Sequence, residues 1–478
     1  MPTYKTPGVY IEEISTLPPS VAEVETAIPA FIGFTERGEK SIPRRITSMV
    51  DYQIYFGGAE PEKSIVVTLQ SDLVTVSIDE PKKSKNVLPY AMQLYFANGG
   101  GPCYIVPCGT FKESGSSLDP YNAALDAIAK EDEPTLLLFP DATLTLGERY
   151  YDLVNLALDQ CEKLGDRFVI IDVINKDKDL RASKDEFRTK VGTNPAAAKY
   201  GAAYYPHLKT TIPYQYDTEA IVISGLAETK TFEPVAAVGV EEEPKPGEIK
   251  KAAPEKKTSR GQSAGFSSLP NATQNKIKQK IAEYGVELTP AAAVAGVYAM
   301  VDSTRGVWKA PANVGLNYVK GPLMKITDDE QNNLNIDPES GKSINAIRSF
   351  IGRGTMIWGA RTLAGNDNEW RYVNVRRFFN MVEESVKKST LWAVFEPNDI
   401  NTWTKVRAMI ENYLLLKWID GALAGKKAED AFFVRVGLGQ TMTAVDIQEG
   451  RMNIVIGIAA VRPAEFIILK FSHKLQNS

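Results

Sequence analysis

The chain has 478 residues, of which 44% are hydrophobic and 24% charged, and its formal net charge is -4. This length predicts several domains, because about 150 residues is usual for one. The composition is typical of a globular protein, the small negative charge excludes a general attraction to nucleic acid, and the spacing of Cys103, Cys108 and Cys161 excludes a disulfide framework or a zinc site.

The N-terminal stretch TPGVYIEEI, residues 6–14, predicts a β-strand that has no partner nearby. Such a strand must find its hydrogen bonds far along the chain or on another molecule. The same region lacks the basic and apolar segments of a secretory signal, and no apolar run reaches the roughly 18 residues of a membrane span. We therefore expect a protein that is made in the cytoplasm and stays there unless something releases it.

The next part of the chain predicts strands, first alone and then alternating with helices. AIPAFIGFTERG, residues 27–38, predicts a buried strand that ends in a turn, and alternating runs between residues 40 and 90 predict a small β-rich unit. From residue 103 onward, continuous apolar strands alternate with amphipathic helices. This pattern is typical of a parallel sheet that is covered on both faces. The strands are CYIVP (103–107), PTLLLFPD (134–141) and RFVIIDVI (167–174).

The segment from about residue 233 to 268 is rich in Glu, Lys, Pro, Ala and Gly, so it predicts a flexible insertion that cannot order itself. Helical patterns resume after it. In the final unit, amphipathic helices are expected over residues 376–389 and 401–419. Strands are expected over residues 452–461 and 465–471.

Catalytic motifs are present only in unfavourable surroundings. GQSAG, residues 261–265, matches the G-x-S-x-G nucleophile elbow, but it lies in the low-complexity insertion rather than between a strand and a helix. The only histidines are His207, beside aromatic residues, and His473, in the C-terminal tail. A Ser263–His207 hydrolase is therefore poorly supported. Asp172 ends a predicted strand, where an enzyme could hold a carboxylate, but a helix cap or turn is the simpler interpretation.

Other candidate binding motifs also fail. The glycine run at residues 98–104 precedes a strand, whereas a phosphate loop follows one, and Asp177 and Asp179 lack the rest of a calcium loop. We expect no cofactor and no metal. The basic pairs Lys387–Lys388 and Lys426–Lys427 favour helix-dipole and solubility roles, with contact to an acidic partner as the alternative.

Eight stretches in order carry a family resemblance. They are TPGVYIEEI, IPAFIGFTERG, YFANGGGPCYIV, AGVYAMVDSTRGVWKAPAN, INAIRSF with MIWGARTL, RRFFNMVEESV, LWAVFEPND and RPAEFIILKF. Together they resemble the tail sheath protein family of contractile phages and phage-derived injection particles. The opening of the chain is more similar to sheaths of extracellular injection particles than to those of large phages.

The resemblance implies a structural polymer rather than an enzyme. The implied fold is α/β and α+β multidomain, with a subtilisin-like α/β middle domain without a catalytic triad, a small β-rich domain and a C-terminal α+β sheath domain with extended N- and C-terminal arms. The expected divisions are an N-terminal linker arm (1–24), an N-terminal segment with the β-rich domain (25–102), the subtilisin-like domain with its insertion (103–353), and the C-terminal sheath domain and arm (354–478).

The resemblance also implies partners and a location. The partners are copies of the chain in a helical homopolymer of stacked rings, an inner tube protein, baseplate and terminal cap proteins, and sheath paralogues in particles that carry several. Direct nucleic-acid contact and membrane insertion are not expected. The subunit would assemble in the cytoplasm and form part of a phage tail or of a released extracellular particle.

Strand exchange between subunits follows from the same resemblance. The residues expected to make these arm contacts are Val9, Tyr10, Ile11, Ile454, Ile456, Ile458, Phe466, Ile467 and Ile468. For the C-terminal set, an intramolecular sheet remains the alternative. Lys426 and Lys427 are expected at the inner tube. Two other classes stay open: a serine hydrolase, and a non-contractile surface or adhesion module.

Overall fold

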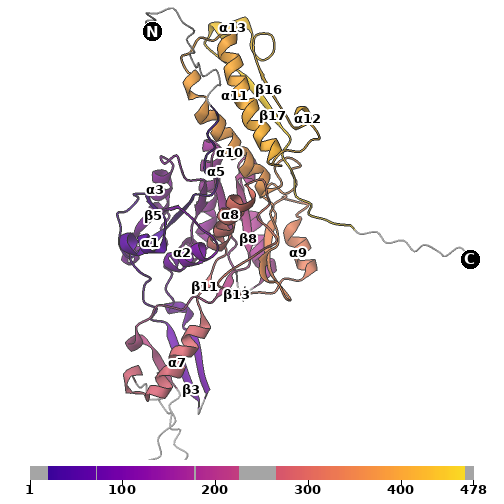
Figure 1. Cartoon of the computed structure of the whole chain (residues 1–478). Coiled ribbons are helices and arrows are strands. Elements are labelled where there is room, and N and C mark those ends of the chain that lie inside the picture. Colours follow the sequence, from indigo (N-terminus) through magenta and orange to yellow (C-terminus); the bar gives the residue numbers. More distant parts are fainter. Residues whose placement is uncertain (1–19, 71–72, 177–178, 225–264, 469–478) are drawn as a thin grey trace, which may run out of the picture.

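The computed structural model describes residues 20–70, 73–176, 179–224 and 265–468. The molecule is elongated, with an α/β body in the middle, a unit built around α10 and α11 at one end, and β3 with α7 at the other (Figure 1). Most of the expected insertion, and the strand expected at residues 6–14, lie outside the described residues.

The body is built on a nine-stranded sheet with the order β12-β15-β14-β8-β7-β6-β1-β5-β2. The six strands from β14 to β5 run parallel, and β12, β15 and β2 are antiparallel to their neighbours. The bounds are β1 (Pro29–Thr35), β2 (Arg44–Ile46), β5 (Cys103–Thr110), β6 (Leu136–Leu138), β7 (Phe168–Asp172), β8 (Gly201–Tyr205), β12 (Val314–Gly315), β14 (Ile344–Phe350) and β15 (Gly354–Ile357).

Successive residues of the same strands supply two separate cores, which explains their continuous apolar sequence. Phe31 and Ile170 belong to one core, whereas the adjoining Ile32 and Ile171 belong to the other. The first core contains residues of α2 (Leu88–Ala97) and α8 (Ala291–Arg305), and the second contains residues of α3 (Asp119–Ile128) and α5 (Tyr150–Leu164). The expected parallel sheet with both faces covered is confirmed. The body also holds α1 (Met49–Phe56), α4 (Ala142–Thr145), α6 (Leu180–Lys190) and α9 (Asp328–Asn335).

Two small sheets flank the body. One has the order β10-β3-β4, formed by β10 (Val222–Ser224), β3 (Ile65–Gln70) and β4 (Leu73–Ile78), and it packs beside α7 (Asn271–Tyr284). The other has the order β11-β9-β13, formed by β11 (Glu287–Leu288), β9 (Leu208–Thr210) and β13 (Val319–Pro322). The strands expected between residues 40 and 90 are therefore present, as β3 and β4.

The strand grouping differs from the expected division of the chain. Residues 25–102 do not form one separate unit, because β1 and β2 pair with β5 in the central sheet. All seven residues of β1 are buried, so this segment gains more from parallel partners on both sides than from a small local sheet. Likewise β15, placed after the expected boundary at residue 354, pairs with β14.

The C-terminal unit contains two long helices and a hairpin. Its elements are α10 (Val373–Ser389), α11 (Ile400–Ile419), α12 (Ala428–Ala431), α13 (Ala444–Gln448), β16 (Phe432–Val436) and β17 (Ile454–Ile458). The expected helices are confirmed. The strand expected at residues 465–471 is wrong for its described part, since residues 465–468 form no regular element. No helix in the described ranges is long and apolar enough to cross a bilayer.

Candidate assembly interface

The hairpin of the C-terminal unit is a sheet of two strands. β16 and β17 pair antiparallel, from Phe432 opposite Ile458 to Val436 opposite Ile454. Within the described residues each strand has only this one strand neighbour, so each has an outer edge. Backbone donors and acceptors along such an edge can accept a further strand from another chain.

The isoleucines of β17 have a place within their own subunit. Ile454, Ile456 and Ile458 are partly buried and pack against the core formed with α10 and α11. The intramolecular alternative therefore describes their side chains. The backbone edge of β17 is a separate matter, and its use by a neighbouring subunit remains a prediction.

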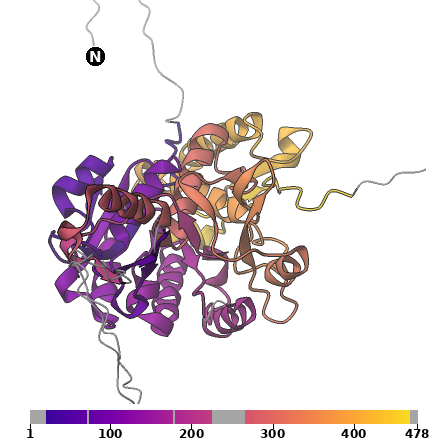
Figure 2. The ribbon, with the colours of Figure 1, turned by 90° about the horizontal axis from the view of Figure 1, so that it is seen from below.

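The C-terminal segment leaves the body in an extended form. In both views its described residues point away from the body (Figure 1, Figure 2). Phe466 is 66% exposed, and Ile467 and Ile468 are each 79% exposed. Three consecutive exposed apolar side chains are unusual on a free surface, and they are what a strand needs in order to dock onto another molecule.

The N-terminal residues expected in the arm, Val9, Tyr10 and Ile11, lie outside the described residues. The first described residues, from 20 onward, run along α10. The backbone N–H of Val24 donates to Ser385 Oγ, and that of Ala22 donates to Ser389 Oγ, each at 3.1 Å. The N-terminal segment therefore meets the C-terminal unit at the last turn of α10.

Sequence reasoning missed an exposed apolar patch between α10 and α11, which we call the Phe395 patch. It consists of Leu391, Val394, Phe395 and Ile400, all exposed. Phe395 is fully exposed and has a φ of 67°, a left-handed conformation that bulky side chains rarely adopt. In sequence, LWAVF resembles an ordinary core stretch, and only the EPND that follows it, which ends in the helix-capping Asp399, hints at a turn.

Lys426 and Lys427 lie in the exposed loop between α11 and α12. Neither forms an ion pair with any residue of the described ranges. By contrast, Lys388 at the end of α10 pairs with Asp132 at 2.7 Å and with Glu384 at 3.5 Å. The loop pair is thus available to a partner, whereas Lys388 connects the C-terminal unit to the body.

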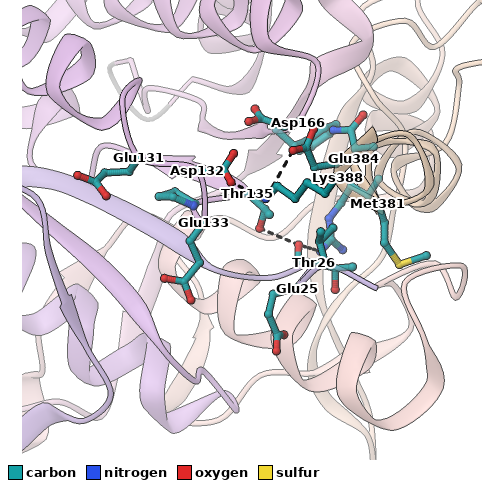
Figure 3. Close-up of a pocket in the computed structure, with 15 residues that line it drawn as sticks. Glu25, Thr26, Glu131, Asp132, Glu133, Thr135, Asp166, Met381, Glu384 and Lys388 are labelled. Atoms are coloured by element: carbon teal, nitrogen blue, oxygen red, sulfur yellow. Dashed lines mark hydrogen bonds and ion pairs between the residues drawn. The ribbon is translucent and has the colours of Figure 1, made fainter. Parts of the chain in front are cut away.

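A cavity of about 390 Å³ lies at the seam between the body and α10 (Figure 3). Acidic side chains line much of it, and Asp132 and Glu384 are paired with Lys388. Deeper in the seam, Arg377 of α10 pairs with Asp302 of α8 at 2.5 Å, and both side chains are almost fully buried. No group of three metal-ligating side chains occurs in the described parts of the chain. These contacts make the cavity part of a packed junction rather than an evident ligand site.

The residues weighed for catalysis have structural roles. Burial lowers the pKa of His207 to about 4, so the ring is neutral at pH 7, and its Nε2 lies 3.2 Å from the carbonyl oxygen of Val173. Asp172, the last residue of β7, accepts a hydrogen bond from the N–H of Ala291 at 2.8 Å, at the first turn of α8, so its carboxylate joins β7 to α8, whose own N-cap residue is Pro290. Ser263 and His473 lie outside the described residues.

The comparisons with known proteins agree with this architecture. A family model described as the phage tail sheath C-terminal domain matches residues 365–474. The tail sheath protein of Burkholderia phage BcepMu is 32% identical over 139 residues, which are 28% of this chain and 29% of that protein. The alignments with curated tail sheath proteins span only 18% to 29% of the length of those proteins.

Two solved structures match over almost the whole chain. The PVC sheath complex of an extracellular contractile injection system, in the contracted state, is 31% identical, with a TM-score of 0.65 over 100% of this chain and 99% of that one. The contracted helical sheath of the anti-feeding prophage is 33% identical, with a TM-score of 0.64 over 99% of this chain and 100% of that one.

Proposed function

The chain belongs to the tail sheath family of contractile phages and phage-like injection particles, and we propose that it polymerises helically around an inner tube and contracts to drive that tube through a target envelope. The family consists of structural proteins, so no enzymatic activity is part of the proposal. The body would be a subtilisin-like α/β domain that has no catalytic triad, and its six parallel strands between two helix layers support this assignment.

One observation carries the proposed linkage between subunits. Within the described residues, the C-terminal unit has a sheet of two strands, and residues 465–468 form an extended segment with three exposed apolar residues. We infer that the outer edges of β16 and β17 receive strands from the N- and C-terminal arms of neighbouring copies, through Val9, Tyr10 and Ile11 and through Phe466, Ile467 and Ile468. A head-to-tail contact of this kind does not close, so it propagates into a helix.

The free energy of such a junction would be large enough to keep neighbouring subunits linked while the lattice changes shape. At about 0.5 to 1.5 kcal/mol net per backbone hydrogen bond, pairing along the five residues of β17 would stabilise each junction by several kcal/mol. The junctions would then hold while the domains repack. Contraction would draw on a kinetically trapped extended state and would need no nucleotide.

The remaining partners follow from the same proposal. Lys426 and Lys427 would contact the inner tube, because they carry positive charge on an exposed loop of the C-terminal unit. The polymer would end at a baseplate and a terminal cap and could include sheath paralogues. Subunits would assemble in the cytoplasm. Similar proteins form part of an anti-feeding prophage baseplate and of an extracellular contractile injection system.

Negative-stain microscopy of the purified protein, alone and with a tube protein, tests the proposal. The intact chain should form striated tubes or rings. Deletion of residues 1–14 should leave a folded monomer that forms no long polymers. Deletion of 14 residues from the low-complexity insertion, 241–254, is the matched control and should still give tubes. Normal tubes from the chain lacking residues 1–14 would show that the arm is not needed, and a monomeric intact chain would favour a non-contractile surface module.

A further inference from the structure

The C-terminal arm, which we define as residue 462 onward, is attached to the subunit in an unusual way. The chain before it is bonded to the C-terminal unit: the N–H of Ala459 donates to the carbonyl of Ala431 at 2.8 Å, and that of Val461 donates to Ala422 at 3.1 Å. Over residues 462–468, no backbone-to-backbone hydrogen bond is formed within the described residues. The arm therefore depends on side chains for its attachment.

Within residues 462–468, one carboxylate makes all the side-chain hydrogen bonds. Glu465 Oε1 accepts from Arg361 Nε at 2.9 Å and from Asn335 Nδ2 at 2.8 Å. Its Oε2 accepts from Arg361 Nη2 at 2.7 Å and from Tyr372 Oη at 3.1 Å. We call Glu465 and these three donors the Glu465 clasp. A bidentate guanidinium–carboxylate pair with two further donors is strong and fixed in direction.

The electrostatic setting favours the charged, closed clasp. The Arg361 side chain is 5% exposed, so water competes little for its donors. Burial by itself raises the pKa of Glu465, but the hydrogen bonds from Arg361, Asn335 and Tyr372 outweigh it and hold the pKa below its ordinary value. The carboxylate therefore stays ionised and bound at neutral pH.

The clasp is connected to the centre of the body. The backbone N–H of Arg361 donates to Asn345 Oδ1, and Asn345 Nδ2 donates back to the carbonyl of Arg361, both at 2.8 Å. Asn345 is fully buried in β14, and its Nδ2 also lies 3.1 Å from the carbonyl of Ala203 in β8. A force on Glu465 is thereby passed to two neighbouring strands of the nine-stranded sheet.

We propose that Glu465 is the positioning residue of the C-terminal arm: through Arg361 it directs tension on the arm into the central sheet and keeps that tension from β17. This inference rests on the proposed function, since it assumes that the arm is pulled by a neighbouring subunit. The clasp would protect the β16–β17 hairpin from force applied to the arm. Without the clasp, a pull on the arm would act on Val461 and then separate β17 from β16, which would open the sheet that holds the lattice together.

A single-molecule force experiment tests the anchor on the full chain, without any polymer. Handles are attached through cysteines introduced at Ile351, a fully exposed residue of the body, and at Ser478, while the native cysteines are buried. At a fixed force, Glu465→Gln should shorten the time to the first rupture about tenfold, because the charge and the bidentate geometry are lost. Arg361→Lys should have an intermediate effect, since lysine keeps the charge but not the fork.

The control is Glu429→Gln, which makes the same charge change at an exposed position of α12 and should rupture like the intact chain. The urea midpoint of each variant is measured beside it, and Glu465→Gln should shorten the time to rupture by more than its fall in midpoint accounts for, because Arg361 loses its counter-charge as well. Equal rupture times for the intact chain and Glu465→Gln would overturn the proposal.

Microscopy separates this inference from the proposed function. If the intact chain forms no tubes, the proposed function fails while the force result stands. If Glu465→Gln forms tubes that break when they contract, the clasp carries load in the sheath. Tubes of this variant that contract without breaking would show that the arm is anchored elsewhere.

Discussion

The body and the C-terminal unit differ in how completely the backbone hydrogen-bonding groups of their strands are paired and their sheet faces covered. In the body, helices cover both faces of a nine-stranded sheet, and buried side chains bond even its loop amides. In the C-terminal unit, two strands have one face against α10 and α11, and Phe433 and Val455 on these strands remain exposed. Within the described residues the body satisfies its own sheet, whereas the open edges of the C-terminal unit are where we propose that other copies add strands.

Of the predicted changes, replacement of Asp141 should lower the free energy of unfolding most, because this side chain satisfies buried backbone N–H groups of the body. Asp141 is fully buried and accepts from the N–H groups of Val87 and Leu88, each at 2.7 Å, and of Phe34 at 2.8 Å. Asp141→Ala leaves three buried donors unpaired, at about 1 to 3 kcal/mol each, so we expect a loss of roughly 3 to 9 kcal/mol in the free energy of unfolding. Unfolding in urea measures this loss of free energy.

The control is Asp126→Ala, on the exposed face of α3. Its free energy of unfolding should stay within about 0.5 kcal/mol of that of the intact chain. A small effect of Asp141→Ala would contradict the view that the body depends on complete internal hydrogen bonding.

A pH dependence of intermediate size should also come from the body. Burial raises the pKa of Asp172 to about 7, although hydrogen bonds from Thr289 and Ala291 lower it in part. The folded chain therefore keeps a proton that the unfolded chain loses above about pH 4. The stability that protonated Asp172 contributes is full below about pH 4 and is lost as the pH rises to about 7. The free energy of unfolding falls over this range by at most about 1.4 kcal/mol per pH unit.

Unfolding in urea between pH 4.5 and 7.5 measures this slope, and Asp172→Asn should reduce it. Part of the slope should remain, because burial also raises the pKa of Asp141 to about 7. An unchanged slope in Asp172→Asn would assign the pH dependence to other groups.

The smallest effect on stability is expected at the Phe395 patch of the C-terminal unit. Glycine adopts the φ of 67° freely, so Phe395→Gly should change the free energy of unfolding by no more than about 1 kcal/mol. Assembly should nevertheless weaken, because an exposed aromatic side chain is lost from the incomplete region.

Ile351→Ser is the matched variant on the body, where another apolar residue is fully exposed. Light scattering should show a higher concentration threshold for polymer formation with Phe395→Gly than with Ile351→Ser. Equal thresholds would mean that the two regions do not differ in their need for partners.

The sequence allowed prediction of those parts whose pattern is local. The apolar strands β5, β6 and β7 and the amphipathic helices α10 and α11 were predictable because burial on two faces or on one face sets the spacing of apolar residues. The partner of a strand is a nonlocal choice, so the placement of β1 and β15 in one sheet was not predictable. The Glu465 clasp joins residues 104 positions apart, and the Phe395 patch has the composition of a core, so neither has a local signal.

The path of α10 has a geometric consequence for the assembled particle. The N-terminal segment meets the subunit at Ser389, the last residue of α10, and the C-terminal arm is held by Tyr372, which directly precedes its first residue. A helix of 17 residues spans about 25 Å at about 1.5 Å per residue. One rigid helix thus sets the distance between the points where the N-terminal segment and the C-terminal arm leave the subunit. In a lattice linked as we propose, the distance between the two exit points of each subunit would be constant, and a change in the pitch of the particle would come from the tilt of α10 rather than from its length.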